Sequence, residues 1–198
     1  MSALPFDGPT TDEISDHPPL PLAVEFLRET LEHVGTDLSV PTPCHGWDLR
    51  MLLAHLDESI ATLREGLTTG RIGPPPTRPR PNCAGTEPIR LRAEGLLADW
   101  TRLRPHPVTI GDLPIPTTVL GAAAALELTA HAWDLGQSTG QPTLIPDGLA
   151  HELLPVAHQL VPIIGRSPLF APPLRSSAAT AGDRLLSHLG RTPRPDTA

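Results

Sequence analysis

The stretch LGAAAALELTAHAWDL, residues Leu120–Leu135, is a long apolar segment in which Glu127 is the only acidic residue before the last turn. His131 follows four positions after Glu127, and residues four apart lie on the same face of a helix. Steps of four and three trace a stripe typical of a core-facing helix, made of Leu120, Ala124, Glu127, His131 and Leu135. A carboxylate buried there without a partner would be costly, so we expect Glu127 to have one, and a divalent metal is the strongest candidate.

Apolar residues recur at helical spacing through much of the chain, which predicts an all-α fold. Asp48 is suited to cap the start of a helix, and Gly70 is suited to end it. The expected helices cover residues 20–34, 49–70, 88–104, 120–140, 147–161 and 181–189, with the fifth interrupted at Pro155. Residues 108–115 alternate around Gly111 and predict a small hairpin or an extended crossover, whereas the proline-rich residues 73–82 predict an exposed connection. Four main helices with short additions indicate a four-helix bundle.

Length and composition fit one globular domain and exclude several classes of partner. At 198 residues, with 39% hydrophobic and 19% charged residues, the chain can form one well-buried domain. We expect this metal-binding domain to cover residues 18–191, between flexible segments at residues 1–17 and 192–198. A net charge of −7 and an aromatic content of 3% argue against nucleic acid as a partner. The N-terminus does not resemble a signal peptide and no apolar run reaches about 18 residues, so we expect a cytoplasmic protein without a membrane span.

A third candidate ligand comes from a different predicted helix. Catalytic zinc sites commonly have three protein ligands, and a pair on one helix needs a third from a facing helix. His55 lies mid-helix at the edge of an apolar face, where a lone neutral histidine has little reason to lie. An equally weighted alternative is that His55 and His131 are core histidines satisfied by hydrogen bonds, with Glu127 bonded to His131 or to an arginine. Spacing alone does not decide between these interpretations, because a glutamate and a histidine four apart form a loose pattern.

Three segments resemble those of a known family. Residues 42–56, TPCHGWDLRMLLAHL, resemble the signature T-P-C-P-G-W-D-V-R-D-L-L-A-H-L of the DinB-like metalloproteins related to the N-terminal domain of mycothiol-dependent maleylpyruvate isomerase. Residues 127–135, ELTAHAWDL, followed by TGQP at 139–142, are similar to that family's second signature. Residues 182–191, GDRLLSHLGR, are similar to its closing segment. Together the three segments span the chain in the order that the family has.

The resemblance implies a DinB-type four-helix bundle with a divalent metal, usually zinc, on His55, Glu127 and His131, and mycothiol as a thiol cofactor. Two histidines and one carboxylate suit iron or nickel as well, so Zn²⁺, Fe²⁺ and Ni²⁺ all remain candidates. His45 replaces the usual proline before Gly46, and we expect it at the surface or the rim of a pocket, with proton transfer or an extra metal contact as alternatives. We expect no counterpart of the isomerase's extra C-terminal domain. The resemblance therefore predicts the metal-binding helical bundle better than it predicts the substrate.

Three further residues within these signatures have structural as well as functional interpretations. Trp47 is expected to pack in the core. Asp134, three residues after His131, either supports that histidine as a hydrogen-bond acceptor or pairs with Arg50, and both interpretations have equal weight. Cys44 precedes a helix start, where a thiolate would be stabilised, but we interpret it as part of a structural signature rather than as a nucleophile.

Three hypotheses about function follow from these features. In the first, the metal binds a thiol such as mycothiol as a thiolate, which attacks an electrophilic small molecule in S-transfer, or adds and leaves again in an isomerisation. In the second, the metal acts as a Lewis acid in a cyclisation, elimination or hydrolysis without a thiol, with His45 as a proton carrier. In the third, the same site binds a metal or small molecule without turnover. We favour a metal-dependent thiol transferase or isomerase, and we expect that the protein can form a homodimer.

Overall fold

The computed structural model describes residues 17–74, 85–102, 106–141, 143–166, 170–175 and 180–193. Six helices lie within these ranges: α1 (Leu20–Leu31), α2 (Leu49–Thr69), α3 (Thr86–Arg102), α4 (Thr117–Ser138), α5 (Asp147–Leu160) and α6 (Ala181–His188). The strands of the same ranges are β1 (Arg71–Ile72), β2 (Val108–Ile110) and β3 (Leu113–Ile115). The predicted all-α fold is therefore confirmed, with one small sheet added.

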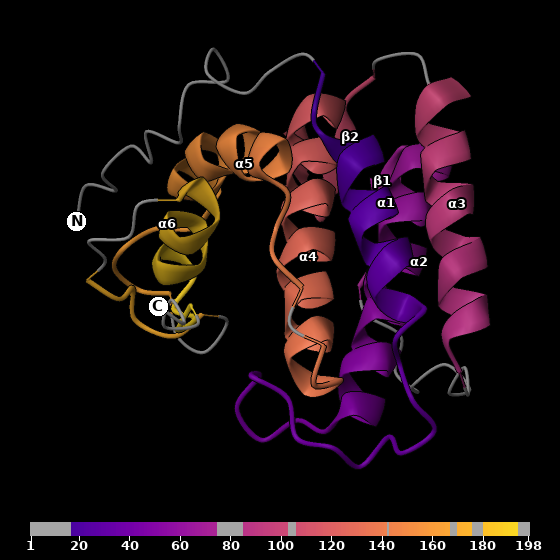
Figure 1. Ribbon diagram of the computed structural model, residues 1–198. Helices are drawn as coiled ribbons and strands as arrows, with labels where there is room; N and C mark the ends of the chain where they lie inside the picture. Colours follow the sequence, from indigo (N-terminus) through magenta and orange to yellow (C-terminus); the bar gives the residue numbers. More distant parts are fainter. Residues whose placement is uncertain are drawn as a thin grey trace.

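Helices α1 to α4 form the four-helix bundle, and α5 and α6 lie along one side of it (Figure 1). Helices α1 and α2 each pack against both α3 and α4. Apolar side chains at helical spacing drive this packing, because burying each large one contributes about 1.5–3 kcal/mol. All four helices contribute fully buried leucines to the shared core, among them Leu27, Leu56, Leu96 and Leu128.

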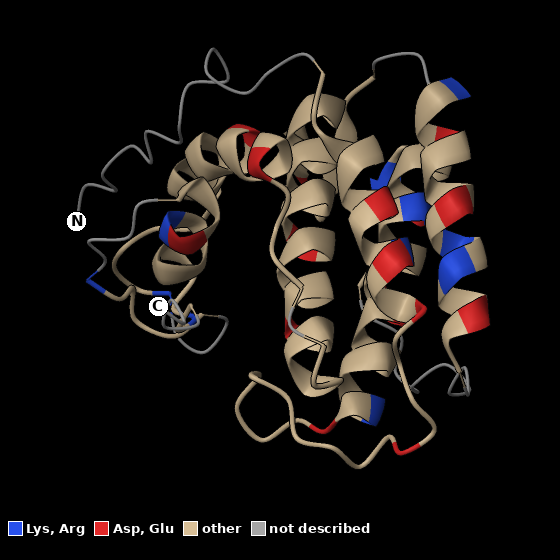
Figure 2. Ribbon diagram, in the orientation of Figure 1, with Lys and Arg blue, Asp and Glu red and all other residues tan. Residues whose placement is uncertain are grey.

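Helix α4 is the most buried element of the bundle, as its sequence predicts. Its buried residues run from Thr117 to Gly136, and α1, α2 and α5 all pack against it. Charged side chains gather instead on α1 and α3, away from α4 (Figure 2). Gly121 leaves room for the Trp100 ring of α3, because a Cβ atom at this position would lie 2.5 Å from that ring. The absence of a side chain at Gly121 therefore lets an aromatic ring pack directly on the backbone of α4.

The limits of α2 are fixed by the residues that flank it. The Asp48 side chain accepts a hydrogen bond from the Met51 amide (2.8 Å), which satisfies one free N–H group at the start of the helix. At the other end Gly70 has a φ of 71°, a left-handed conformation that glycine adopts without steric cost. Both predicted helix limits are confirmed, and they fix the length of the helix that carries His55.

A small sheet lies between the end of α2 and the start of α4. Strands β2 and β3 pair antiparallel across the turn at Gly111, so the predicted hairpin is present. Strand β1 pairs in parallel with β2, and the Thr109 amide donates to the Gly70 carbonyl (2.9 Å). The sequence does not predict β1, because two residues directly after a helix end are too few to show a strand pattern.

Helix α5 continues through Pro155, so the predicted interruption at that residue is wrong. Proline removes one intrahelical hydrogen bond, but buried Leu149, Leu153 and Ala157 hold α5 in its packed position and offset that loss. Helix α5 packs against α4 on one side and against α6 on the other. The two C-terminal helices thus form a unit that is attached to the bundle through α5.

In the part of the chain that the structure describes, no helix combines the length and apolar character needed to cross a membrane. The predicted connection at residues 73–82 and the terminal segments at 1–17 and 192–198 lie mostly outside the described residues. The predicted domain limits therefore stay a prediction.

Candidate metal centre

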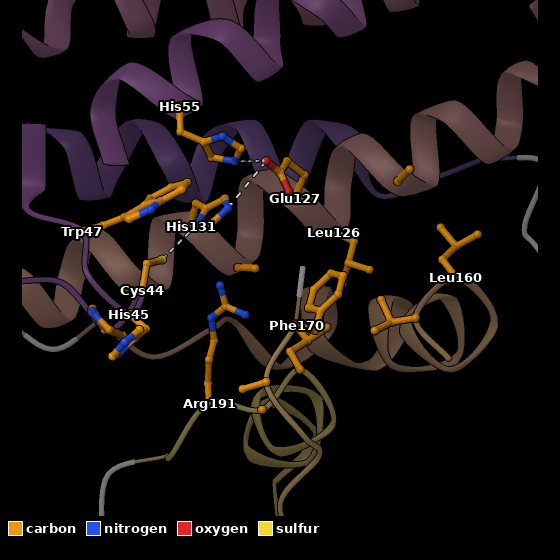
Figure 3. Close-up of a pocket in the computed structure, with 17 residues that line it drawn as sticks. Cys44, His45, Trp47, His55, Leu126, Glu127, His131, Leu160, Phe170 and Arg191 are labelled. Atoms are coloured by element: carbon orange, nitrogen blue, oxygen red, sulfur yellow. Dashed lines mark hydrogen bonds and ion pairs between the residues drawn. The ribbon is translucent and has the colours of Figure 1, made fainter. Parts of the chain in front are cut away.

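A cavity of about 730 Å³ opens beside α4, and two distant parts of the chain form its wall (Figure 3). One part consists of residues 43–47, α2 and α4, and the other consists of the end of α5 with residues 170–171 and 189–191. The polar lining side chains are Cys44, His45, His55, Glu127, His131 and Arg191. The apolar lining includes Leu126, Ala130, Leu160, Val161, Phe170 and Leu189. The cavity therefore offers both a polar cluster and an apolar surface to a bound molecule.

The three predicted ligands meet at this polar cluster. His55 extends from α2, whereas Glu127 and His131 extend from α4, one helical turn apart (Figure 3). The Nε2 atom of His55 lies 2.8 Å from Oε1 of Glu127, and the Nε2 atom of His131 lies 3.6 Å from the same oxygen. One donor atom from each of the three residues lies within 4.8 Å of the other two. The fold thus brings the two separate sequence signatures together.

This donor set fits a divalent metal ion. Two imidazole nitrogens and one carboxylate oxygen, with a further position open, are the protein ligands of many catalytic zinc sites. Metal–ligand bonds of about 2.1 Å in a tetrahedral geometry place neighbouring donor atoms about 3.4 Å apart. The 3.6 Å separation between Glu127 and His131 is close to this value. The 2.8 Å separation between His55 and Glu127 would have to widen by about 0.6 Å when a metal binds.

Glu127 also has protein partners of its own. The Glu127 side chain keeps 31% of its surface exposed, so it is less buried than its place on the predicted core stripe suggests. The Nε2 atom of His55 and the hydroxyl of Ser59 (2.9 Å) both donate to Oε1. Burial alone would raise the pKa of Glu127, but the hydrogen bond from His55 and the attraction of His131 lower it to about 2. The carboxylate is therefore charged and already satisfied, so the case for a metal rests on donor geometry and not on an unpaired charge.

Asp134 connects His131 to the far end of the described chain. Its fully buried carboxylate accepts hydrogen bonds from Nδ1 of His131 (2.9 Å) and from Nε and Nη2 of Arg191 (2.9 and 2.6 Å). Burial would raise the pKa of Asp134, but the hydrogen bonds from Arg191 and His131 lower it to about 2. Of the two predicted roles, the support of His131 is present, whereas the arginine partner is Arg191 and not Arg50.

A second group of metal-binding residue types shares His131 and adds Cys44 and Asp134. In this group the Arg191 guanidinium already lies on both Asp134 oxygens, where a metal cation would have to compete with it. The Cys44 thiol donates to Asp134 (3.3 Å), and burial together with the charge of Asp134 raises the pKa of the thiol to about 12. Nucleophilic attack needs a thiolate, so the raised pKa disfavours that role, and a metal ion at this group would first have to displace the Arg191 guanidinium from Asp134. Cys44 serves here as a hydrogen-bond donor, in agreement with its predicted structural role.

His45 and Trp47 lie beside the three candidate ligands but differ in their contacts. His45 is exposed and lines the cavity, and among the described residues its ring makes no hydrogen bond with the candidate ligands. Trp47 packs edge-on against the His55 ring, with 5.0 Å between centroids, and lies nearly parallel to the His131 ring at 6.5 Å. Trp47 therefore contacts the core, as predicted, and also forms part of the cavity wall.

Comparison with known proteins agrees with this architecture. The family model described as the mycothiol maleylpyruvate isomerase N-terminal domain matches residues 20–136. The chain belongs to this family. Two uncharacterized proteins of Mycobacterium tuberculosis, from strains CDC 1551 / Oshkosh and ATCC 25618 / H37Rv, are each 28% identical to it over 184 residues, which cover 87% of this chain and 95% of theirs. No solved structure gives a significant match.

The match to the mycothiol maleylpyruvate isomerase N-terminal domain contains the candidate ligands but only part of the cavity. All three ligands lie within residues 20–136, whereas Arg191 lies beyond them. Sequence reasoning missed both Ser59 and Arg191 as residues of the site. Ser59 follows His55 by four positions on one helix face, and this spacing could have revealed it. Arg191 ends the segment that resembles the family's closing segment, but its contact with Asp134 has no local signal, because 57 positions separate the two residues.

Proposed function

We propose that this protein is a metal-dependent enzyme of the mycothiol type, which transfers a thiol to an electrophilic small molecule or isomerises such a molecule with the help of a thiol. The observation that supports this proposal is the convergence of His55, Glu127 and His131 on one end of a cavity of about 730 Å³. We propose zinc as the metal because this donor set matches catalytic zinc sites. Held there, the ion would lower the pKa of a thiol and supply a thiolate nucleophile at neutral pH.

The family to which the chain belongs supports a low-molecular-weight thiol as one substrate, since the description of that family names mycothiol. The cavity volume is within the range of small-molecule sites, which span about 300–1,000 Å³. It therefore has room for more than the sulfur-bearing end of a thiol. A thiol and an acceptor bound together would have their reacting atoms held close, which replaces a bimolecular encounter by an oriented one.

The apolar wall indicates what the rest of the acceptor molecule is like. Leu126, Leu160 and Phe170 line the cavity together with the candidate ligands (Figure 3). Apolar side chains keep water away from a nucleophile and bind apolar parts of a ligand. We therefore propose an acceptor with an apolar body and one electrophilic group that reaches the polar cluster.

A thiol-independent reaction is a second candidate, and the position of His45 favours it. His45 lines the cavity and is exposed, so it can exchange protons with water. In a metal-assisted elimination, cyclisation or hydrolysis, such a residue would carry a proton between substrate and solvent. Binding without turnover is the third hypothesis, but three protein donors facing a cavity suit an open catalytic site better than a closed structural one.

The metal site is tested by elemental analysis of protein prepared without a metal-affinity tag. The parent should contain about one transition metal ion per chain, and His55→Ala and Glu127→Ala should lose most of it. His151→Ala is the matched control, since this exposed histidine on α5 bonds only its own helix, at Asp147 O, among the described residues. A parent that stays metal-free after incubation with Zn²⁺ and removal of excess ion would refute the proposed site.

The thiol reaction is tested with the zinc-loaded parent and His55→Ala, using monochlorobimane as a generic electrophile. Mycothiol, cysteine and glutathione are compared as donors of the sulfur that displaces chloride. We expect a rate above background that needs both the metal and a particular thiol. Metal-loaded protein that accelerates the reaction with none of the thiols, yet hydrolyses or dehydrates other substrates, would favour the thiol-independent alternative.

A further inference from the structure

We infer that Arg191 is a positioning residue of the metal centre, which fixes the orientation of His131 through Asp134. This inference rests on the proposed metal site but concerns a part of the chain beyond residues 20–136, which the family model matches. Arg191 follows α6 and extends to the carboxylate of Asp134 on α4. Arg191 is the last residue of the segment that resembles the family's closing segment, but neither that resemblance nor the comparisons assign it a role.

Arg191 and Asp134 form a bidentate ion pair. Nε of Arg191 donates to Oδ1 (2.9 Å) and Nη2 donates to Oδ2 (2.6 Å), so both carboxylate oxygens are held. The Asp134 side chain is 0% exposed and that of Arg191 is 14% exposed, so water competes little for this contact. Paired hydrogen bonds between a guanidinium and a carboxylate fix the plane of the carboxylate as well as its distance.

The held carboxylate in turn holds the imidazole of His131. Oδ2 of Asp134 accepts a hydrogen bond from Nδ1 of His131 at 2.9 Å. Because a carboxylate can only accept, the proton lies on Nδ1, and the lone pair of His131 lies on Nε2, the atom that faces Glu127 at 3.6 Å. Without Arg191, the terminal torsion of Asp134 could rotate over a broad range, and the orientation of the His131 ring would be less defined.

The turn at the end of α6 places Arg191 for this contact. The Arg191 amide donates to Leu186 O (2.8 Å) and the Gly190 amide donates to Ser187 O (3.1 Å), which together form a Schellman motif. Gly190 has a φ of 77°, and a Cβ atom at this position would lie 2.6 Å from Ala171 O. The backbone before Arg191 is therefore fixed by hydrogen bonds and by a close approach that other residues would disturb.

A merely structural role is the alternative: the ion pair would tie the C-terminal unit to the bundle without influencing the metal. The two roles differ in what they predict for metal affinity. A structural tie changes the free energy of unfolding alone, whereas a positioning residue changes the affinity and the ligand geometry of the folded protein. Residues that orient metal ligands typically contribute 10–100-fold to metal affinity.

The experiment compares Arg191→Met with the parent and with Arg64→Met. Arg64 is the matched control, because its Nε donates to Asp99 Oδ2 at 2.7 Å in another interhelical pair, nine residues along α2 from His55. Zinc affinity is measured by competition with a chromophoric chelator, and ligand geometry is measured from the visible absorption of Co²⁺-loaded protein. We expect Arg191→Met to bind Zn²⁺ about 10–100-fold more weakly with an altered Co²⁺ spectrum, and Arg64→Met to match the parent.

If Arg191→Met does not fold, Arg191→Lys carries the test. Lysine keeps the charge but not the paired geometry, so the positioning role predicts folded protein with weakened Zn²⁺ binding and a shifted Co²⁺ spectrum. Folded Arg191 variants with affinity within about twofold of the parent and an unchanged spectrum would overturn the inference while leaving the metal site intact. A parent that binds neither ion would overturn the proposed function, and the inference with it.

Discussion

Removing one partner of the buried ion pair of Asp134 and Arg191 should strongly destabilise the fold. Asp134→Ala removes a carboxylate that is 0% exposed and leaves the Arg191 guanidinium buried without its partner. Breaking such a pair from one side costs about 3–5 kcal/mol, because the remaining charge is desolvated and uncompensated. For a chain of this size each kcal/mol lowers the Tm by about 2–4 °C, so we expect a Tm about 6–20 °C below that of the parent.

The assay is urea unfolding followed by circular dichroism, with a chelator present so that metal binding does not contribute. Arg191→Met and the double variant Asp134→Ala/Arg191→Met complete a thermodynamic cycle. The double variant leaves no orphaned charge, so its loss should be smaller than the sum of the two single losses by about 0.5–3 kcal/mol. A single Asp134→Ala loss below about 1 kcal/mol, or additive losses, would refute the reasoning.

Three further predictions concern the scaffold. Gly121→Ala should lower the free energy of unfolding by about 1–3 kcal/mol, because the added methyl group meets the Trp100 ring. Gly148→Ala should raise it by up to about 1 kcal/mol, because the methyl group there meets no atom within 4 Å, and equal changes in urea unfolding for the two variants would contradict this reasoning. Asp48→Ala should lower the free energy of unfolding by about 0.5–2 kcal/mol through loss of the helix cap, whereas Asp48→Ser should retain most of that stability. Equal losses in the two variants would count against a capping role. Burial lowers the pKa of His188 below 6.5, so the contribution of the neutral imidazole to stability is complete above pH 6.5 and falls as the pH drops towards the folded pKa. The urea midpoint of His188→Gln should therefore fall less between pH 7.5 and 5.5 than that of the parent, and an equal fall would exclude His188 as a source of the pH dependence.

The sequence predicts most of the fold because the decisive signals are local. Asp48 and Gly70 limit α2 through contacts within a few positions, and the apolar stretch Leu120–Leu135 is recognisable as a buried helix from its own composition. Pro155 misleads because local propensity disfavours a helix there, whereas tertiary packing of α5 outweighs it. Strand β1 is too short to carry any periodic signal.

The sequence predicts the candidate metal ligands but not all of the residues that support them. The spacing of Glu127 and His131 places them on one helix face, and the position of His55 mid-helix at the edge of an apolar face makes it the third candidate, which the resemblance supports. The structure places the three residues together. The pairing of Asp134 with Arg191 cannot be read from the sequence, because it depends on how α5 and α6 return to the bundle. Long-range contacts of this kind follow from tertiary packing and leave no mark in the spacing of neighbouring residues.

The division of the cavity between two parts of the chain has a consequence for how such proteins can diversify. The candidate metal ligands lie on α2 and α4, whereas much of the apolar surface, including Leu160 and Phe170, belongs to the C-terminal part. Substitutions at Leu160 or Phe170 would reshape the apolar part of the cavity without displacing a candidate metal ligand. A single bundle could thus support a series of enzymes that share one reactive centre and differ in the compounds they admit.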